Sequence, residues 1–308
     1  MSAVQATSRP SAFAVLRDYY QLTKPTIVML MLVTGLPAIL MAGNGFPSPR
    51  LMVVALLGTA MAAGAASVLN HWYDRDIDGL MERTSHRPII AGTVGPNQAL
   101  AFGLTMGTLS ILLLGLFANW LSAGLALTAI VYYVLVYTVW LKRRTPQNIV
   151  IGGGAGAMAP LIGWAAITGT VGLPAWLMFL VVFMWTPPHF WALALYRRID
   201  YAKAGVPMMP VVAGEDSTRL QILVYTVLLV ATSLALYATK ACGAIYLVGA
   251  LGLGASFTAG AFRLYREKTD AAAKKLFIQS IFYLLILFVL LFVDELARLA
   301  LVATHHGG

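Results

Sequence analysis

Nine apolar runs, each long enough to cross a lipid bilayer, divide this chain of 308 residues. About 20 apolar residues span the hydrocarbon core of a membrane. The runs lie near residues 26–43, 52–72, 98–117, 120–140, 148–167, 174–196, 219–239, 243–263 and 277–300. Only 11% of the residues are charged, whereas soluble domains carry about 25%. The sequence therefore predicts an all-α polytopic membrane protein with about nine transmembrane helices, in a single domain over residues 1–308.

Basic residues predict the orientation of these spans, because cytoplasmic segments carry an excess of Lys and Arg. With the N-terminal segment 1–20 in the cytoplasm, 18 of the 21 Lys and Arg residues fall on the cytoplasmic side. The other three, Arg50, Lys240 and Arg298, fall on the opposite side. This placement explains the net charge of +9 without a nucleic-acid partner. An odd number of spans puts the C-terminus on the opposite side of the membrane, which we expect to be the cell inner membrane. We expect no cleavable signal peptide in the first 24 residues, and the single Cys242 excludes an internal disulfide framework.

Asn70, Asp74 and Asp78 follow one another at four-residue intervals where the second span ends. A helix turns about 100° per residue, so the three side chains fall near one face, roughly 6 Å apart along the axis. Hard oxygen ligands of this kind suit Mg²⁺, which typically takes one or two carboxylates plus the phosphate oxygens of a substrate. Asp76 lies off that face. The pattern predicts a membrane enzyme that handles a diphosphate, with 73–97 as a cytoplasmic active-site loop.

A second polar segment closes the sixth span, where Pro187 and Pro188 precede His189 and, further on, Asp200. Prolines inside a helix remove backbone donors, so we expect a bend or break there. Broken membrane helices are tolerated where they line a cavity. Because the second and sixth spans enter the cytoplasm in the same direction and each bring acidic residues, we expect an internal pseudo-repeat around one shared site. The 197–218 segment is then the second active-site loop.

Basic side chains on the same side of the membrane complete this expected site. The candidates for binding a diphosphate are Lys24, Arg83, Lys142 and Arg143. Positive charges and a metal ion together stabilise the charge that develops as a diphosphate leaves. Each cation taken alone also fits a second role, as a positive-inside anchor of its span.

Several segments of the chain resemble the UbiA superfamily of intramembrane prenyltransferases, over about residues 16–300. The similar segments are Leu22-Thr23-Lys24-Pro25, the run from Asn70 to Asp78 with Met81-Glu82-Arg83-Thr84, the run from Trp140 to Gly153, the run from Pro188 to Leu193, and Asp200-Tyr201 with the run from Pro207 to Val211. The acidic motif alone points only to the superfamily, whereas His189 and Asp200-Tyr201 resemble its haem-farnesylating branch. Many members carry a second Asp-x-x-x-Asp motif. Here Tyr196 and Ala204 stand four residues from Asp200, which puts a second metal held by two carboxylates in doubt.

The resemblance implies a helical bundle around a central cavity and Mg²⁺-dependent transfer of a farnesyl group from farnesyl diphosphate to a vinyl group of haem B, giving haem O. It further implies metal ligation by Asn70, Asp74, Asp78 and Asp200. His189 is expected to face the haem, as an axial ligand or as a proton acceptor, and His71 is a weaker candidate for haem contact. Aromatic faces attract cations, and the candidates near the site are Trp72, Tyr73, Tyr137, Trp185, Phe190 and Trp191. Expected partners are membrane lipid and, beyond the two substrates, a haem-modifying enzyme or a second copy of the chain.

Two other functions remain open at this point. One is prenyl transfer by the same superfamily to a quinone precursor or a chlorin. The other is a transporter or proton channel, because intramembrane acids and broken helices also mark transport paths. The acids of this chain gather at one membrane face, whereas transporter sites lie near the midplane, which favours the enzyme.

Overall fold

The computed structural model describes residues 11–43, 45–82 and 84–306, with side chains as far as Leu301. Within those ranges every regular element is a helix. The helices are α1 (Ala12–Leu22), α2 (Pro25–Met41), α3 (Pro49–Tyr73), α4 (Arg75–Asp78), α5 (Pro96–Phe117), α6 (Trp120–Val131), the π-helix η1 (Tyr132–Leu141), α7 (Asn148–Gly156), α8 (Ala159–Thr168), α9 (Leu173–Tyr196), α10 (Arg198–Lys203), α11 (Met209–Val212), α12 (Glu215–Ala238), α13 (Ala244–Glu267) and α14 (Asp270–His306).

The number of membrane-spanning helices agrees with the sequence. In the described part of the chain, eight helical stretches are long and apolar enough to cross a membrane. The pair α1 and α2, bent by 53° at its break, makes a ninth if it is counted as one span. The prediction of an all-α bundle with about nine transmembrane helices is therefore confirmed, and the first span contains a bend that its hydropathy did not indicate.

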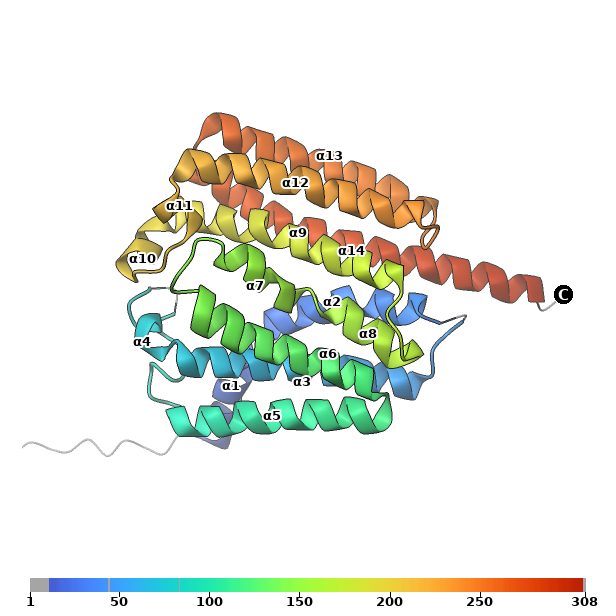
Figure 1. Ribbon diagram of the computed structural model, residues 1–308, viewed down its shortest axis with the longest axis horizontal. Helices are drawn as coiled ribbons and strands as arrows, with labels where there is room; N and C mark the ends of the chain where they lie inside the picture. The colour runs from blue at the N-terminus through green and yellow to red at the C-terminus, as the bar shows by residue number, and fades with distance from the viewer. Residues whose placement is uncertain (1–10, 44, 83, 307–308) are drawn as a thin grey trace, which may run out of the picture.

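The helices form two halves that face each other (Figure 1). In one half α3 packs against α5, and α2 packs against α8. In the other half α9 packs against α12 and α14, and α13 packs against α14. Leu114 and Ile162 are buried in the first half, and Phe257 and Phe288 are buried in the second. The halves also pack together, because α2 contacts α14 and Ala38 of α2 belongs to the same buried cluster as Phe257 and Phe288.

The two expected active-site loops lie at the same end of the bundle. Figure 1 shows α4, α10 and α11 together at that end, beyond the ends of α3 and α9. The 73–97 segment contains α4 followed by turns, and the 197–218 segment contains α10 and α11. The next spanning helix, α12, begins at Glu215, four residues earlier than the hydropathy indicates.

The interruptions of the spans are not where the prolines suggest. Of the bend or break expected at Pro187 and Pro188, a break is wrong, because α9 runs through both prolines as one helix of 24 residues. Packing against neighbouring helices lets membrane helices accommodate proline, and here α12 and α14 pack alongside α9. The fifth span is the broken one, since α7 ends at Gly156 and α8 begins at Ala159.

Lys24 stands at the bend between α1 and α2. Its backbone is left-handed, with φ 52° and ψ 64°, a conformation that is uncommon for residues other than glycine. Pro25 follows it and opens α2, and proline disfavours the helical conformation in the residue before it. Strained backbone of this kind gathers at functional sites. The bend aims the Lys24 side chain at the end of α3, where Asn70 lies.

Candidate functional site

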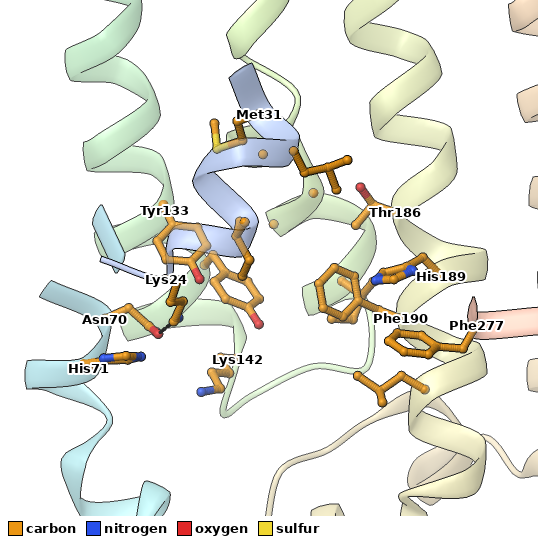
Figure 2. Close-up of a pocket in the computed structure, with 18 of the residues that line it drawn as sticks. Lys24, Met31, Asn70, His71, Tyr133, Lys142, Thr186, His189, Phe190 and Phe277 are labelled. Carbon is orange, nitrogen blue, oxygen red and sulfur yellow. Dashed lines mark hydrogen bonds between the residues drawn. The ribbon is translucent and has the colours of Figure 1, made fainter. Parts of the chain in front are cut away.

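A cavity of about 710 Å³ lies between the two halves, and we call it the central cavity. Helices α2, α3, α7, α9 and α14 and the π-helix η1 all contribute to its lining. Small-molecule sites typically have volumes of about 300–1,000 Å³. Figure 2 shows basic and amide side chains at one side of this cavity and aromatic side chains around His189 on the other. The cavity therefore has a polar part and an apolar part, as a site for an amphipathic substrate requires.

Asn70 is the centre of the polar part. Its Oδ1 accepts a hydrogen bond from the Nζ of Lys24 at 2.8 Å. Its Nδ2 donates to the Oδ2 of Asp74 at 2.7 Å and to the Oγ1 of Thr138 at 3.0 Å. The Thr138 hydroxyl in turn donates to the carbonyl of Tyr133 at 2.9 Å, within the π-helix. One amide thus joins α2, α3 and η1 at the mouth of the bundle.

Asp74 is fully buried next to Asn70 and is paired with two cations. Lys142 forms an ion pair with its Oδ2, and the guanidinium of Arg143 lies 3.3 Å from its Oδ1. Arg143 also forms two hydrogen bonds with Asp76, at 2.6 and 2.7 Å. These bonds hold the pKa of Asp76 below its ordinary value. The Asp76 side chain is 58% exposed, so its carboxylate faces outward while that of Asp74 faces the protein interior.

Asp78 continues the line formed by Asn70 and Asp74. The amide of Asp74 bonds to the carbonyl of Asn70, and the amide of Asp78 bonds to the carbonyl of Asp74, both at 2.9 Å. The helical register therefore persists from α3 into α4. Arg87 pairs with the Oδ2 of Asp78, and burial raises the pKa of Asp78. The Oδ1 of Asp78 is buried with no hydrogen-bond partner among the described residues.

His189 stands on the other side of the central cavity (Figure 2). Its ring stacks between Trp185, with centroids 4.2 Å apart, and Phe277, with centroids 4.6 Å apart. Its Nδ1 shares a hydrogen bond of 2.7 Å with the hydroxyl of Ser280. A histidine ring held by one nitrogen and stacked on both faces has a fixed orientation.

His71 also lines the cavity, next to Asn70. Its side chain is buried, and neither ring nitrogen has a hydrogen-bond partner in the part of the chain that the structure describes. Buried polar groups are normally hydrogen-bonded. A ligand in the cavity would supply the missing partner.

Two of the residues expected at the site remain outside this description. Arg83 lies outside the described residues. Asp200 forms an ion pair with Arg197 at 3.5 Å and, like Asp74 and Asp78, does not line the central cavity, although its neighbour Tyr201 does. The described residues contain no group of three or more His, Cys, Asp or Glu side chains placed to hold one metal ion. The roles of Asp200 and Arg83 stay predictions.

The structure also adds residues that the sequence did not single out. Arg87, Tyr133 and Phe277 line the cavity, and Thr138 and Ser280 orient Asn70 and His189. Thr138 and Ser280 are polar residues inside apolar runs, a pattern that could have marked them in the sequence as candidate site residues.

Of the six aromatic candidates, Tyr137, Trp185 and Phe190 line the cavity. The other three lie elsewhere: Trp72 under Arg75, Tyr73 under Arg143, and Trp191 in the core against Tyr225.

The donor atoms at the polar part fit a divalent cation with a preference for oxygen. Asn70, Asp74 and Asp78 offer amide and carboxylate oxygens on one helical face, and the Oδ1 of Asp78 is unpartnered within the described ranges. Mg²⁺ bound by one or two carboxylates completes its coordination with water and substrate phosphate oxygens. In this structure Lys142, Arg143 and Arg87 balance the two buried carboxylates, and the same cations are within reach of a bound anion.

Comparison with known proteins gives consistent results. Residues 31–290 match the UbiA prenyltransferase family. The chain is 51% identical over 290 residues to the protoheme IX farnesyltransferase of Gloeobacter violaceus, covering 94% of this chain and 95% of that protein. It is 49% identical to the protein of the same name from Symbiobacterium thermophilum, covering 94% and 98%.

Solved structures share the fold at lower identity. A digeranylgeranylglyceryl phosphate synthase superposes with a TM-score of 0.77 at 20% identity, covering 91% of this chain and 98% of that one. A UbiA homologue from Archaeoglobus fulgidus, bound to DMAPP and Mg²⁺, superposes with a TM-score of 0.61 at 17% identity, covering 90% and 99%.

Proposed function

This chain belongs to the UbiA prenyltransferase family, and on that premise we propose that it transfers a farnesyl group from farnesyl diphosphate to a vinyl group of haem B, giving haem O and diphosphate. The observation that carries the proposal is that one cavity contains both a cationic part built on Asn70 and a stacked imidazole, His189, on its other side. The first suits a diphosphate, and the second offers a porphyrin substrate an imidazole held in a fixed orientation. The high identity to protoheme IX farnesyltransferases over almost the whole chain supports the same substrates.

Lys24, Arg87 and Lys142 line the cavity and bind the diphosphate in this proposal, with Arg143 beside them on Asp74. Preorganised cations aimed at the place where charge develops are usually the largest contribution to catalysis. In this structure these side chains contact Asn70, Asp74 or Asp78, so the cations would exchange those oxygens for the diphosphate as metal and substrate bind. Arg83 is a further candidate from the sequence.

We infer that the reaction depends on a metal and that the metal is Mg²⁺, held by Asn70, Asp74 and Asp78, with Asp200 as an additional ligand. A bound Mg²⁺ would polarise the diphosphate oxygens and so favour cleavage of the bond to the farnesyl carbon. The Mg²⁺ and DMAPP in the Archaeoglobus fulgidus homologue support this inference. Asp200 would first have to leave its ion pair with Arg197.

The reaction balances without a protein nucleophile. The carbon–oxygen bond of farnesyl diphosphate breaks, the terminal vinyl carbon bonds to the farnesyl carbon, and water adds to the other vinyl carbon and releases a proton. Aromatic rings stabilise an allylic cation by about 0.5–2 kcal/mol each, and Tyr133, Tyr137 and Phe190 face the cavity for this role. His189 faces the haem, as an axial ligand or as the acceptor of the proton, and His71 contacts the bound substrates from the polar part.

Multiple long apolar helices make this chain a multi-pass membrane protein. We propose that it lies in the cell inner membrane with its N-terminus in the cytoplasm and its C-terminus on the other side. The excess of Lys and Arg at the end of the bundle that contains α4 and α10 supports this orientation, since cytoplasmic loops are basic. Reporter fusions before Ala12 and after Leu301 test it, and equal reporter activity of the two fusions would reverse the assignment of one terminus.

The function is tested with the purified protein in lipid vesicles, labelled farnesyl diphosphate and either haem B or 4-hydroxybenzoate. We expect label in a haem product, no product after chelation with EDTA, and recovery when Mg²⁺ is restored. Label in the quinone precursor with unchanged haem would show the other prenyltransferase activity. Ion flux across the vesicles without any prenyl transfer would instead show a transporter.

A further inference from the structure

A second, smaller cavity of about 70 Å³ adjoins the central cavity, and we call it the side cavity. The two share four lining residues, namely Ile27, Met31, Tyr133 and Gly156. Helices α2, α3, α6, α7 and α8 and the π-helix η1 surround the side cavity, and most of its wall is apolar. Because its lining is continuous with that of the central cavity, the side cavity is an extension of the same space.

Gly156 stands at the boundary between these cavities and leaves open space there. A methyl group on its Cα would meet no heavy atom within 4 Å in the described part of the chain. Two other glycines of α7 differ. A methyl group on Gly152 would lie 2.2 Å from the ring of Tyr137, and one on Gly153 would lie 2.8 Å from Thr186. Close packing requires glycine at positions 152 and 153, whereas it does not require glycine at position 156.

The boundary lies on the path that a substrate anchored by its diphosphate would follow. In Figure 2, Lys24, Asn70 and Lys142 mark the polar part of the cavity, and Met31 lies at the other end of the view from Lys142. Tyr133 lies across the cavity from His189 (Figure 2). An isoprenoid chain that runs from the polar part towards Met31 and Tyr133 leaves the side with His189 free for the second substrate.

We propose that the side cavity receives the last isoprene unit of the farnesyl chain, and that Gly156 determines chain-length specificity by leaving the passage open. This inference rests on the proposed function. A water-sized group needs about 10–15 Å³ of such space, so 70 Å³ holds roughly five to seven such groups, which is of the order of one branched isoprene unit. A porphyrin ring is too large to enter, so the occupant is the tail of the prenyl substrate.

Gly156→Leu tests the proposal, because its side chain would fill the passage. The matched control is Gly124→Leu on α6, since Gly124 also has no heavy atom within 4 Å of an added methyl in the described chain but lines neither cavity. Each protein is assayed in lipid vesicles with haem B and either geranyl or farnesyl diphosphate, and the prenylated haems are separated by mass. The measured quantity is the ratio of kcat/KM for farnesyl to that for geranyl diphosphate.

We expect Gly156→Leu to lower this ratio by about tenfold or more, because a misfit of even one methylene in an apolar pocket changes specificity by roughly 10–200-fold. Gly124→Leu should leave the ratio at the wild-type value. A ratio unchanged in Gly156→Leu, in a protein that still uses geranyl diphosphate, would overturn the proposal. Absence of any prenylated haem with the wild-type protein would instead contradict the proposed function.

Two further variants keep the test decisive if Gly156→Leu does not fold. Gly156→Ala adds one methyl group in open space and improves helix propensity, so it should fold and shift the ratio in the same direction by a smaller factor. Ala63→Leu fills the side cavity from α3, from a residue that does not line the central cavity. Wild-type ratios in both variants would also reject the proposal.

Discussion

The Nζ of Lys24 donates a hydrogen bond to the Oδ1 of Asn70 at 2.8 Å, joining two residues that are 46 positions apart in the chain. The bend between α1 and α2 makes this contact possible, because Lys24 adopts a left-handed backbone conformation. Its ammonium also lies 5.9 Å from the centre of the Tyr133 ring. The segment before α2 thus supplies a cation to the face of α3 that contains Asn70.

Loss of this cation should impair use of the diphosphate substrate. For Lys24→Met we expect kcat/KM for farnesyl diphosphate to fall by about 100-fold, the typical cost of removing one preorganised electrostatic contact. Steady-state kinetics in lipid vesicles provide the measurement. Arg75→Met is the control, because Arg75 stacks on Trp72 and does not line the central cavity. Equal kinetics for the two variants would exclude Lys24 from the site.

The acidic residues should differ in importance according to their burial. Asp74→Asn keeps a side chain that can bond to Asn70 but removes the charge, and we expect turnover to fall by at least about 100-fold. Asp76→Asn changes an exposed carboxylate, and exposed ion pairs contribute about 0.2–1 kcal/mol, so its rate should stay within about fivefold of wild type. Wild-type rates in both Asp74→Asn and Asp78→Asn would refute the metal site.

Thr138 should affect the binding of farnesyl diphosphate by holding the Asn70 side chain in place. Its hydroxyl accepts from Asn70 and donates to the carbonyl of Tyr133, so Thr138→Val leaves a buried amide hydrogen without that acceptor. We expect KM for farnesyl diphosphate to rise by roughly tenfold, equivalent to about 1.4 kcal/mol, and Thr138→Ser to restore it. Thr128→Val is the control, because the exposed Thr128 bonds only within α6. An unchanged KM in Thr138→Val would show that Asn70 is held by its other partners.

The Ser280 side chain should affect the binding of haem B and leave the KM for farnesyl diphosphate unchanged. Ser280→Ala removes the partner of His189 Nδ1, and the loss of one such bond costs about 1 kcal/mol. We expect haem B to bind roughly fivefold more weakly in a spectroscopic titration, with KM for farnesyl diphosphate unchanged. If instead the farnesyl diphosphate KM rose and haem affinity stayed constant, His189 would belong to the prenyl side of the cavity.

Features with a local origin could be predicted from the sequence. Hydropathy predicts the spans because about 20 apolar residues are needed whatever their neighbours are. The four-residue spacing predicts that Asn70, Asp74 and Asp78 share a face, and the backbone hydrogen bonds show that register. The start of α6 also has a local origin, since Asn119 caps the helix through the amide of Ser122.

Features that depend on distant contacts could not be predicted in this way. The sequence marks Arg87 as a positive-inside anchor, and only the turns at 79–82 and 84–95 bring it to Asp78. Pro187 and Pro188 indicate a break by local rules, yet the packing of α12 and α14 keeps α9 continuous. The sequence pattern predicts Asp200 as part of the acidic site, whereas the turn into α10 places it beside Arg197. In each case tertiary packing decides what the local pattern leaves open.

The most direct test of the central claim is mass spectrometry of haems from membranes of a host that lacks its own haem O. Cells that express the wild-type chain should contain haem B together with a product heavier by one farnesyl group and one hydroxyl group. Cells that express Asp74→Asn at the same level should contain haem B alone. Unmodified haem in the wild-type membranes, with the protein present and farnesyl diphosphate available, would contradict the account.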